Sequence, residues 1–201
     1  MMYDVCVIGS GAGAGPIIYE LSQKGLKVCV LEKGDIYTEK DFSKDEIVVR
    51  KSIYTPNLKD EYHTIEEFID GSWQKFPTYE TGWNFWNGSL LGGSSNFMSG
   101  YFHRLKPNDF KLASSYEVPK DSNIVDWPIS YDDMEKYYEK VERVVGISGK
   151  VQEYEFSEPR STKDFPYAAL QENKIVDLID KSCKELNYKS IKTPRAIITK
   201  Q

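Results

Sequence analysis

Two short apolar runs near the N-terminus flank a stretch with helical periodicity. Residues 3–8 (YDVCVI) and 27–32 (KVCVLE) are rich in valine and isoleucine, which is typical of fully buried parallel strands. Between them, apolar and small residues recur at helical spacing, and Gly25 predicts the end of this helix. The order strand, glycine turn, helix, strand predicts a right-handed crossover with parallel strands and the glycine turn at their carboxyl edge.

The middle of the chain has a weaker pattern. Charged residues, tyrosine and threonine alternate without a clear period over 36–84, so we expect a loop with one short helix near Thr64–Ile69. A loop rich in glycine and tryptophan follows at 82–93. The two serines after it can cap a helix over Asn96–Phe102, so a second glycine turn is predicted to enter a second helix.

The C-terminal part contains two amphipathic patterns. A helix is predicted to begin at Ser130, with Asp133 as its capping acid, and to end at Gly146. Its apolar stripe comprises Met134, Tyr137, Tyr138, Val141, Val144 and Val145. The other predicted segments are a loop over 150–170, a helix over Asn173–Leu186 with Cys183 on its buried stripe, and a short strand over Ala196–Thr199.

The first glycine turn fits a dinucleotide-binding fingerprint, G-x-G-x-x-G/A, over residues 9–14 (GSGAGA). Glycine permits the tight turn and the approach of a pyrophosphate, and Ala14 or Gly15 lets the helix lie close to the strand. Glu32 ends the second strand, where a carboxylate can accept both ribose hydroxyls and would repel the 2′-phosphate of NADP. The candidate cofactor-binding residues here are Gly9, Gly11, Ala12, Gly13, Ala14 and Glu32. The fingerprint alone does not separate FAD from NAD.

The second glycine turn, LGGSSN, supplies a further candidate set: Gly92, Gly93, Ser94 and Asn96. Its backbone can cradle the same pyrophosphate or the flavin ring, because a glycine turn that enters a helix presents free N–H groups. The alternative is a simple loop with a serine cap.

Four runs, in this order, resemble the glucose-methanol-choline (GMC) oxidoreductases: VIGSGAGAGP, VLEKG, NGSLLGGSSNFMSGYFHR and DWPISYDDMEKYYEKVERVVGISG. Within that family, the R-x-x-P-x-D-F run at Arg104, Pro107, Asp109 and Phe110 is similar to the branch of gluconate, fructose and sorbitol dehydrogenases. The resemblance covers most of residues 3–149.

The resemblance implies an α/β fold: a Rossmann-type FAD-binding βαβ unit with a parallel sheet, as an incomplete N-terminal part of a two-domain GMC fold. We expect an FAD-binding domain over 1–125, with a loop or lid insertion at about 36–84, and a helical segment over 126–201 that leads into an incomplete substrate or cap domain. The implied function is oxidation of an alcohol group of a sugar, sugar acid or polyol by hydride transfer to flavin.

Departures from the family pattern refine these expectations. Members that bind flavin covalently carry a histidine where this sequence has Phe97, so noncovalent FAD is expected, and a flavin-contacting asparagine of many members is replaced by Met98. The family's proton-accepting histidine lies several hundred residues further on, so catalytic residues stay unassigned and the 201-residue chain is expected to be inactive alone. The histidines present, His63 and His103, are expected on the surface or in loops.

Composition narrows the partners. The net charge of −5 and the lack of a basic cluster disfavour nucleic acid, and no run is long enough to cross a membrane. Three cysteines suit a reducing compartment, and Cys6 and Cys29 lie in the strand-like runs as small core residues. We expect a cytoplasmic protein with a small-molecule substrate and no metal, or a periplasmic one if it is exported with a partner subunit. A C-terminal partner chain or an electron-transfer subunit would fit. The tryptophans are expected to pack in cores: Trp73, Trp83, Trp86 and Trp127.

Two other readings stay open. The chain can be noncatalytic, as a truncated product or the flavin-binding piece of an enzyme encoded in two parts. It can also be an NAD-linked dehydrogenase, in which residues 88–96 are only a loop.

Overall fold

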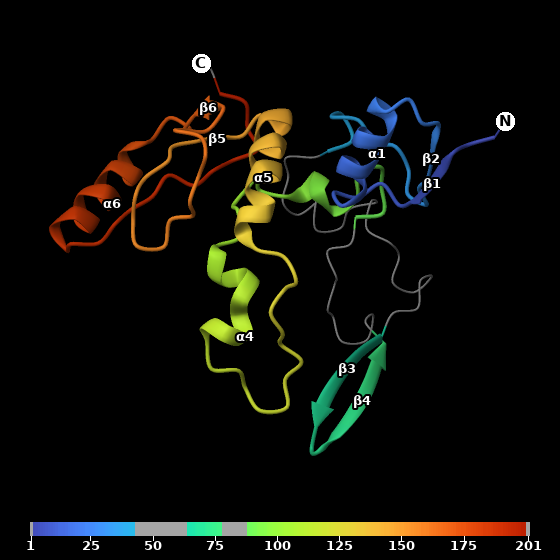
Figure 1. The fold of residues 1–201 in the computed structure, drawn as a ribbon, viewed down its shortest axis with the longest axis horizontal. Helices are drawn as coiled ribbons and strands as arrows, with labels where there is room; N and C mark the ends of the chain where they lie inside the picture. The colour runs from blue at the N-terminus through green and yellow to red at the C-terminus, as the bar shows by residue number, and fades with distance from the viewer. Residues whose placement is uncertain (1, 43–63, 78–87, 200–201) are drawn as a thin grey trace. The chain divides into compact units, whose positions relative to one another are not determined.

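A computed structural model describes residues 2–42, 64–77 and 88–199. The chain divides into two units, Met1–Met98 and Ser99–Gln201. The first contains the predicted βαβ unit: β1 (Val5–Ile8), α1 (Ala14–Gln23) and β2 (Val28–Leu31) (Figure 1). The two strands pair in parallel from Val5 opposite Val28 to Ile8 opposite Leu31, which confirms the predicted crossover.

Gly25 ends α1 as predicted. Its φ of 79° lies in the left-handed region, which glycine adopts without a steric penalty. The N–H groups of Gly25 and Leu26 donate to the carbonyls of Ser22 and Leu21 at 3.0 and 3.2 Å. These bonds satisfy carbonyls at the end of the helix and turn the chain towards β2.

The expectation of fully buried strands in this unit is wrong. Cys6 is exposed, Cys29 is half-buried, and Ile8 is 88% exposed. Two strands and one helix cannot cover both faces and both edges of a sheet, and an isolated pair of strands is marginal in water. Neither cysteine is therefore a core residue among the described residues.

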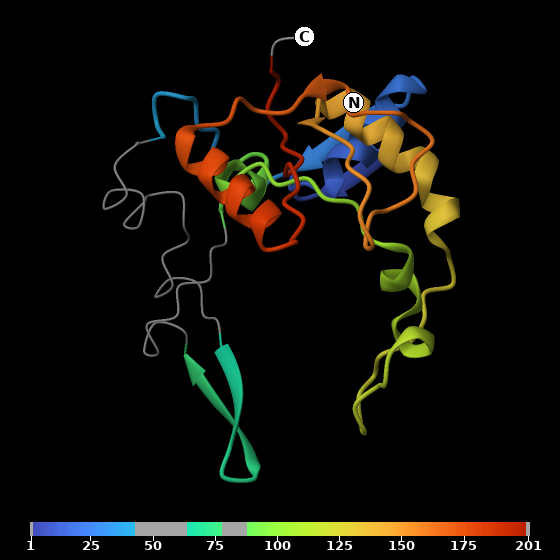
Figure 2. The same ribbon diagram turned by 90° about the vertical axis from the view of Figure 1, so that its left-hand side faces the viewer.

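The short helix expected near Thr64–Ile69 is also wrong, because this segment is β3 (Thr64–Ile69) and pairs antiparallel with β4 (Ser72–Pro77). Asp70 and Gly71 join the strands with φ values of 50° and 81°, the backbone of a type I′ hairpin turn. Figure 2 shows the two strands twisting about each other. Trp73 is 70% exposed on this hairpin beside Phe68, so the expected core packing of Trp73 is wrong too.

The helix expected over Asn96–Phe102 is replaced by a short 3₁₀ helix, η1 (Gly93–Phe97). Gly92 and Gly93 have φ values of 90° and 62°, and Met98 is already extended, so the segment closes one tight turn and then leaves it.

The second unit contains η2 (Pro107–Lys111), α4 (Leu112–Ser115) and α5 (Tyr131–Val145). The ends of α5 are as predicted. The N–H of Asp133 donates to the Ser130 hydroxyl at 3.3 Å, and the Asp133 carboxylate accepts from the Ser130 N–H at 2.8 Å. Gly146 ends the helix with a φ of 80°.

The core of this unit forms around Phe110, Tyr131 and Ile147, which are buried. The ring of Trp127 lies edge-on to Phe110 at 5.5 Å, while about half of Trp127 stays exposed, so the expected packing is partial. The side of α5 buried most deeply is not its apolar stripe, since the buried residues of this helix are Tyr131 and Glu142.

The rest of the unit is built from short elements. β5 (Ser148–Gly149) pairs in parallel with β6 (Tyr167–Ala168), which interrupts the loop expected over 150–170. α6 (Lys174–Glu185) begins after Asn173, whose side chain accepts from two N–H groups of the first turn. The strand expected over Ala196–Thr199 does not form, and the pairing in this segment is confined to isolated bridges of Arg195 with Tyr101 and Ser148.

The expected burial of the α6 stripe is wrong. Among its residues, Ile175, Leu178 and Ile179 are exposed and Cys183 is half-buried. Within the described residues, no helix is long and apolar enough to cross a membrane. Trp83 and Trp86 lie outside the described residues.

Candidate functional site

The first glycine turn lies at the carboxyl end of β1. Gly9 has a φ of 84°, which is strained for any residue with a Cβ, and its N–H donates to the carbonyl of Leu31 at 2.7 Å. The carbonyl of Gly11 accepts from the N–H of Ala14 at 2.9 Å and starts α1. The turn therefore leads the chain directly from β1 into the N-terminus of the helix.

The glycines of this turn have open space on the side where a side chain would stand. A Cβ added at Gly9, Gly11, Gly13 or Gly15 would meet no atom within 4 Å. The free N–H groups in the first turn of α1 carry a partial positive charge, and no side chain caps them. The turn thus fits an anionic pyrophosphate. An added Cβ at Gly15 would have room, so the packing of this helix does not require glycine at that position.

Glu32 follows β2, and its carboxylate is bound by the backbone around it. Oε2 accepts from the Ser10 hydroxyl at 2.6 Å and from the Ser10 N–H at 2.9 Å, and Oε1 accepts from the Gly34 N–H at 2.8 Å. The hydroxyl of Ser10, followed by the N–H groups of Gly34 and Ser10, lowers the pKa of Glu32 from 4.5 to about 2. The group is ionised at neutral pH.

These three bonds take up most of the acceptor capacity of the carboxylate, which has about four lone-pair sites. The backbone N–H of Lys33 also lowers the pKa of Glu32, so the carboxylate in this conformation is held largely by the chain's own donors.

The second glycine turn is held by its own polar side chains. Asn96 Nδ2 donates to the carbonyls of Leu91 and Gly93 at 3.0 and 2.9 Å, and the Ser94 hydroxyl accepts from the Gly88 N–H at 2.9 Å. The Ser95 hydroxyl donates to the carbonyl of Gly92 at 2.6 Å. Ser94 and Asn96 therefore shape the turn.

The structure brings the two turns together. A Cβ on Gly93 would lie 3.2 Å from the Cα of Gly11, so the two backbones touch. The N–H of Gly92 donates to the Ser10 hydroxyl at 2.9 Å, and this hydroxyl in turn donates to Glu32. These contacts bring Gly92 and Gly93 of the second turn against Ser10 and Gly11 of the first, at the carboxyl end of β1.

Sequence reasoning missed three residues of this site. Ser10 occupies a variable position of the fingerprint, and its hydroxyl was the signal that could have indicated a hydrogen bond to Glu32. Gly34 leaves no room for a Cβ, which would overlap the backbone of residues 89–90, and the carbonyl of Asp35 accepts from the Leu91 N–H at 2.9 Å. A glycine soon after the end of each strand, Gly9 after β1 and Gly34 after β2, was the signal that could have indicated a close approach of backbone.

The second unit holds a different kind of polar centre, a buried ion cluster around Arg104. The Arg104 guanidinium donates to both carboxylate oxygens of Glu142 at 2.8 Å, and Arg160 Nη2 donates to Glu142 Oε2 at 2.5 Å. Nη1 of Arg104 also donates to Glu135 and to the Tyr131 hydroxyl, at 3.0 and 3.1 Å. The side chains of Arg104 and Glu142 are 2% and 3% exposed.

Burial disfavours the charge of Arg104, but its hydrogen bonds with Glu142, Tyr131 and Glu135 outweigh the loss of solvent and raise its pKa. The resemblance had singled out Arg104 only as part of a motif, and the structure gives it a structural role as the partner of Glu142.

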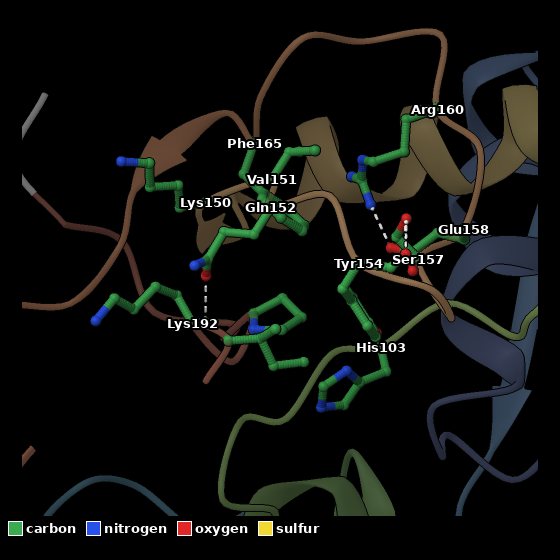
Figure 3. A pocket seen from close by; sticks show the side chains of 12 residues that line it. His103, Lys150, Val151, Gln152, Tyr154, Ser157, Glu158, Arg160, Phe165 and Lys192 are labelled. Carbon is green, nitrogen blue, oxygen red and sulfur yellow. Dashed lines mark hydrogen bonds and ion pairs between the residues drawn. The ribbon is translucent and has the colours of Figure 1, made fainter. Parts of the chain in front are cut away.

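His103 lines a small hollow in this unit, together with Tyr154, Arg160 and Phe165 (Figure 3). The hollow has a volume of about 40 Å³, which admits a few water molecules but is far smaller than a small-molecule site of roughly 300–1,000 Å³. His103 itself is exposed, as expected, and stacks at 6.3 Å on Tyr101. His63 lies outside the described residues. In the part of the chain that the structure describes, no cluster of His, Cys, Asp and Glu suits a metal ion.

Comparisons with known proteins identify the chain's relatives. No family model matches. The chain is 32% identical over 155 residues to the 2-methyl-1,2-propanediol dehydrogenase of Mycolicibacterium austroafricanum, covering 74% of the chain and 25% of that protein. It is 28% identical over 218 residues to the gluconate 2-dehydrogenase flavoprotein of Pantoea cypripedii, covering 96% and 35%. The fructose dehydrogenase large subunit of Gluconobacter japonicus is 28% identical over 159 residues, covering 73% and 27%.

A solved structure, pyridoxine 4-oxidase from Mesorbium loti, matches 56% of the chain and 20% of its own length at 19% identity, with a TM-score of 0.32. The chain belongs to the GMC oxidoreductases and corresponds to their N-terminal part. It spans 25% to 35% of the length of the three curated relatives named above.

Proposed function

We propose that this chain is the FAD-binding part of an oxidoreductase that oxidises an alcohol group of a sugar, sugar acid or polyol. The observation that carries the proposal is the contact between the two glycine turns, since Gly93 approaches Gly11 beside open space at the N-terminus of α1. The relatives support it by name: one is a flavoprotein, and the others are dehydrogenases of a diol and of fructose.

The chain's own residues would bind and orient the cofactor. The N–H groups between Gly11 and the first turn of α1 would hold the pyrophosphate, and the Glu32 carboxylate would accept from a ribose hydroxyl. Gly92 and Gly93 would bring a second stretch of backbone against the same ligand. FAD, when bound, supplies a flavin that accepts a hydride from the carbinol carbon.

We expect noncovalent FAD, because Phe97 offers no nucleophile where covalent relatives carry a histidine. The purified chain mixed with FAD should show the absorbance of bound oxidised flavin, and acid precipitation should release all of the flavin into the supernatant. Yellow colour left in the pellet would contradict noncovalent attachment. Binding of NAD with no binding of FAD would favour the NAD-linked reading instead.

We also expect no alcohol dehydrogenase activity from the 201-residue chain by itself. Loss of a general base typically costs 10²–10⁴-fold in rate, and loss of substrate positioning costs more. The assay is turnover of gluconate, fructose, sorbitol or glucose with a dye acceptor, by monodisperse chain with added FAD. Turnover above the flavin-only control would contradict this expectation and would make His63 and His103 the first residues to substitute.

The hypothesis of a noncatalytic chain applies to the 201-residue chain by itself. It is compatible with flavin binding. A C-terminal partner chain or an electron-transfer subunit would complete the enzyme, and we place the protein in the cytoplasm, or in the periplasm if it is exported with such a partner. Mixing the chain with a candidate partner and recovering substrate-dependent dye reduction is the test of that assembly.

A further inference from the structure

We infer that Ser10 is a positioning residue whose single hydroxyl docks the second glycine turn onto the first and orients the Glu32 carboxylate. Its effect on cofactor affinity rests on the proposed function, whereas its effect on the cofactor-free chain does not. No motif marks this residue, because it occupies a variable position of the fingerprint.

The contacts of Ser10 connect three separate parts of the sequence. Its hydroxyl donates to Glu32 Oε2 at 2.6 Å and accepts from the Gly92 N–H at 2.9 Å. Its own N–H donates to the same carboxylate oxygen at 2.9 Å. A hydroxyl has one donor and two acceptor positions, so both bonds form at once and one residue connects the two turns to the strand-end acid.

The two bonds reinforce one another. A hydroxyl that donates to an ionised carboxylate is a better acceptor for a further N–H, because hydrogen bonds in a chain polarise their members. The Ser10 hydroxyl is also the largest of the causes that lower the pKa of Glu32. The docking of Gly92 is therefore coupled to the charge on Glu32.

Only a residue with a short hydroxyl serves both partners. Alanine at position 10 would leave the Gly92 N–H without its acceptor and Glu32 Oε2 with one donor fewer. Threonine would keep the hydroxyl. The Leu91 N–H still donates to the carbonyl of Asp35 at 2.9 Å, so the loss of the Ser10 hydroxyl removes one of several attachments of this segment.

The consequence for ligand binding is preorganisation. With the second turn already docked, a dinucleotide at the first turn does not bear the entropic cost of ordering residues 88–98. With Ser10→Ala, that cost returns and Glu32 loses a contact that fixes its rotamer. We expect the Kd for FAD to rise about tenfold, the size of one hydrogen bond to a charged group.

The test begins with the cofactor-free chain. Hydrogen exchange by NMR should show the Gly92 amide exchanging about tenfold faster in Ser10→Ala than in wild type, because an amide that loses its partner is protected less. The carboxyl carbon of Glu32 should titrate with a pKa near 2 in wild type and at a higher pH in Ser10→Ala. Ser10→Thr should restore both values.

Ser95→Ala is the matched control. This hydroxyl belongs to the same turn and donates at 2.6 Å to the carbonyl of Gly92, but it has no bond to Glu32. We expect it to leave the pKa of Glu32 unchanged. If Ser10→Ala does not fold, Ser10→Cys, which has nearly the same shape and only a weak donor, gives the same comparison.

Unchanged Gly92 exchange and an unchanged Glu32 pKa in Ser10→Ala would overturn the inference. The FAD titration separates the two proposals. If wild type binds no FAD, the proposed function fails while the exchange data still decide the role of Ser10. If wild type binds FAD and Ser10→Ala binds it equally well, the coupling to affinity is refuted.

Discussion

The two units place their buried or constrained polar groups in opposite ways. In Met1–Met98, the site is made of backbone N–H groups, two glycine turns and one hydroxyl, and the acid Glu32 is bound without any cationic partner among its hydrogen bonds. In Ser99–Gln201, two arginines converge on the buried carboxylate of Glu142. The first arrangement leaves the Cβ positions of its first glycine turn open to a ligand, and the second pairs its buried charges with one another.

This difference predicts different sensitivities. A site formed by two closely packed backbone segments tolerates changes of side chain elsewhere, but it does not tolerate an added Cβ where the two backbones meet. A buried ion cluster tolerates no loss of one member, because the remaining charges stay desolvated and unpaired. Substitutions in the two units should therefore separate structural from ligand-binding effects.

The largest effect is expected from Glu142→Ala. It would leave Arg104 and Arg160 buried without their shared carboxylate and should lower the free energy of unfolding of this unit by about 3–5 kcal/mol. Urea unfolding followed through the NMR signals of α5 amides measures the change. Glu185→Ala is the control, since its ion pair with Lys181 is exposed, and it should change stability by less than about 0.5 kcal/mol.

Equal stability of Glu142→Ala and Glu185→Ala would remove the contrast, because the cluster around Arg104 would then be no more important than a surface pair. Binding of FAD by Glu142→Ala, measured under conditions where the variant is folded, is expected to match wild type if the cofactor site belongs to the first unit alone.

A smaller effect is expected from Gly34→Ala. The new Cβ would overlap backbone atoms of Ser89 and Leu90, so the Leu91 N–H must move away from the carbonyl of Asp35. Overpacking of this kind typically costs about 1–3 kcal/mol. Hydrogen exchange at the Leu91 amide should accelerate accordingly.

Gly15→Ala provides the smallest effect and the control for Gly34→Ala. A Cβ at Gly15 meets nothing within 4 Å beyond its chain neighbours, and the gain in helix propensity is opposed by Pro16, which disfavours a helical residue with a Cβ before it, so stability should change by less than about 1 kcal/mol. If both substitutions destabilised the chain alike, the close approach at Gly34 would not be the cause.

Features with a local signature were predictable from the sequence. The βαβ unit follows from two apolar runs around a glycine turn, and Gly25, Ser130 with Asp133, and Gly146 act within a few residues of where they stand. The hairpin at Thr64–Pro77 also has a local signature, because Asp70-Gly71 is a strong turn signal. This signal outweighs the short run of glutamates, and a helix was wrongly expected there.

Features that depend on distant partners had no such signature. The bond between Ser10 and Gly92 joins residues 82 positions apart, and Arg104 and Glu142 are 38 apart. Nothing in the spacing of either pair distinguishes it from other polar residues. The prediction that the strands are buried failed for a related reason. Ile8 needs neighbours that two strands and one helix do not supply.

If both glycine turns form one FAD site, hydrogen exchange with and without FAD should detect it. We expect FAD to slow exchange of the amides of the first turn, over Gly11–Ala14, and of the second, over Gly92–Asn96, in the same titration. Slowing confined to the first turn, with the second unchanged, would show that the second glycine turn is only a loop.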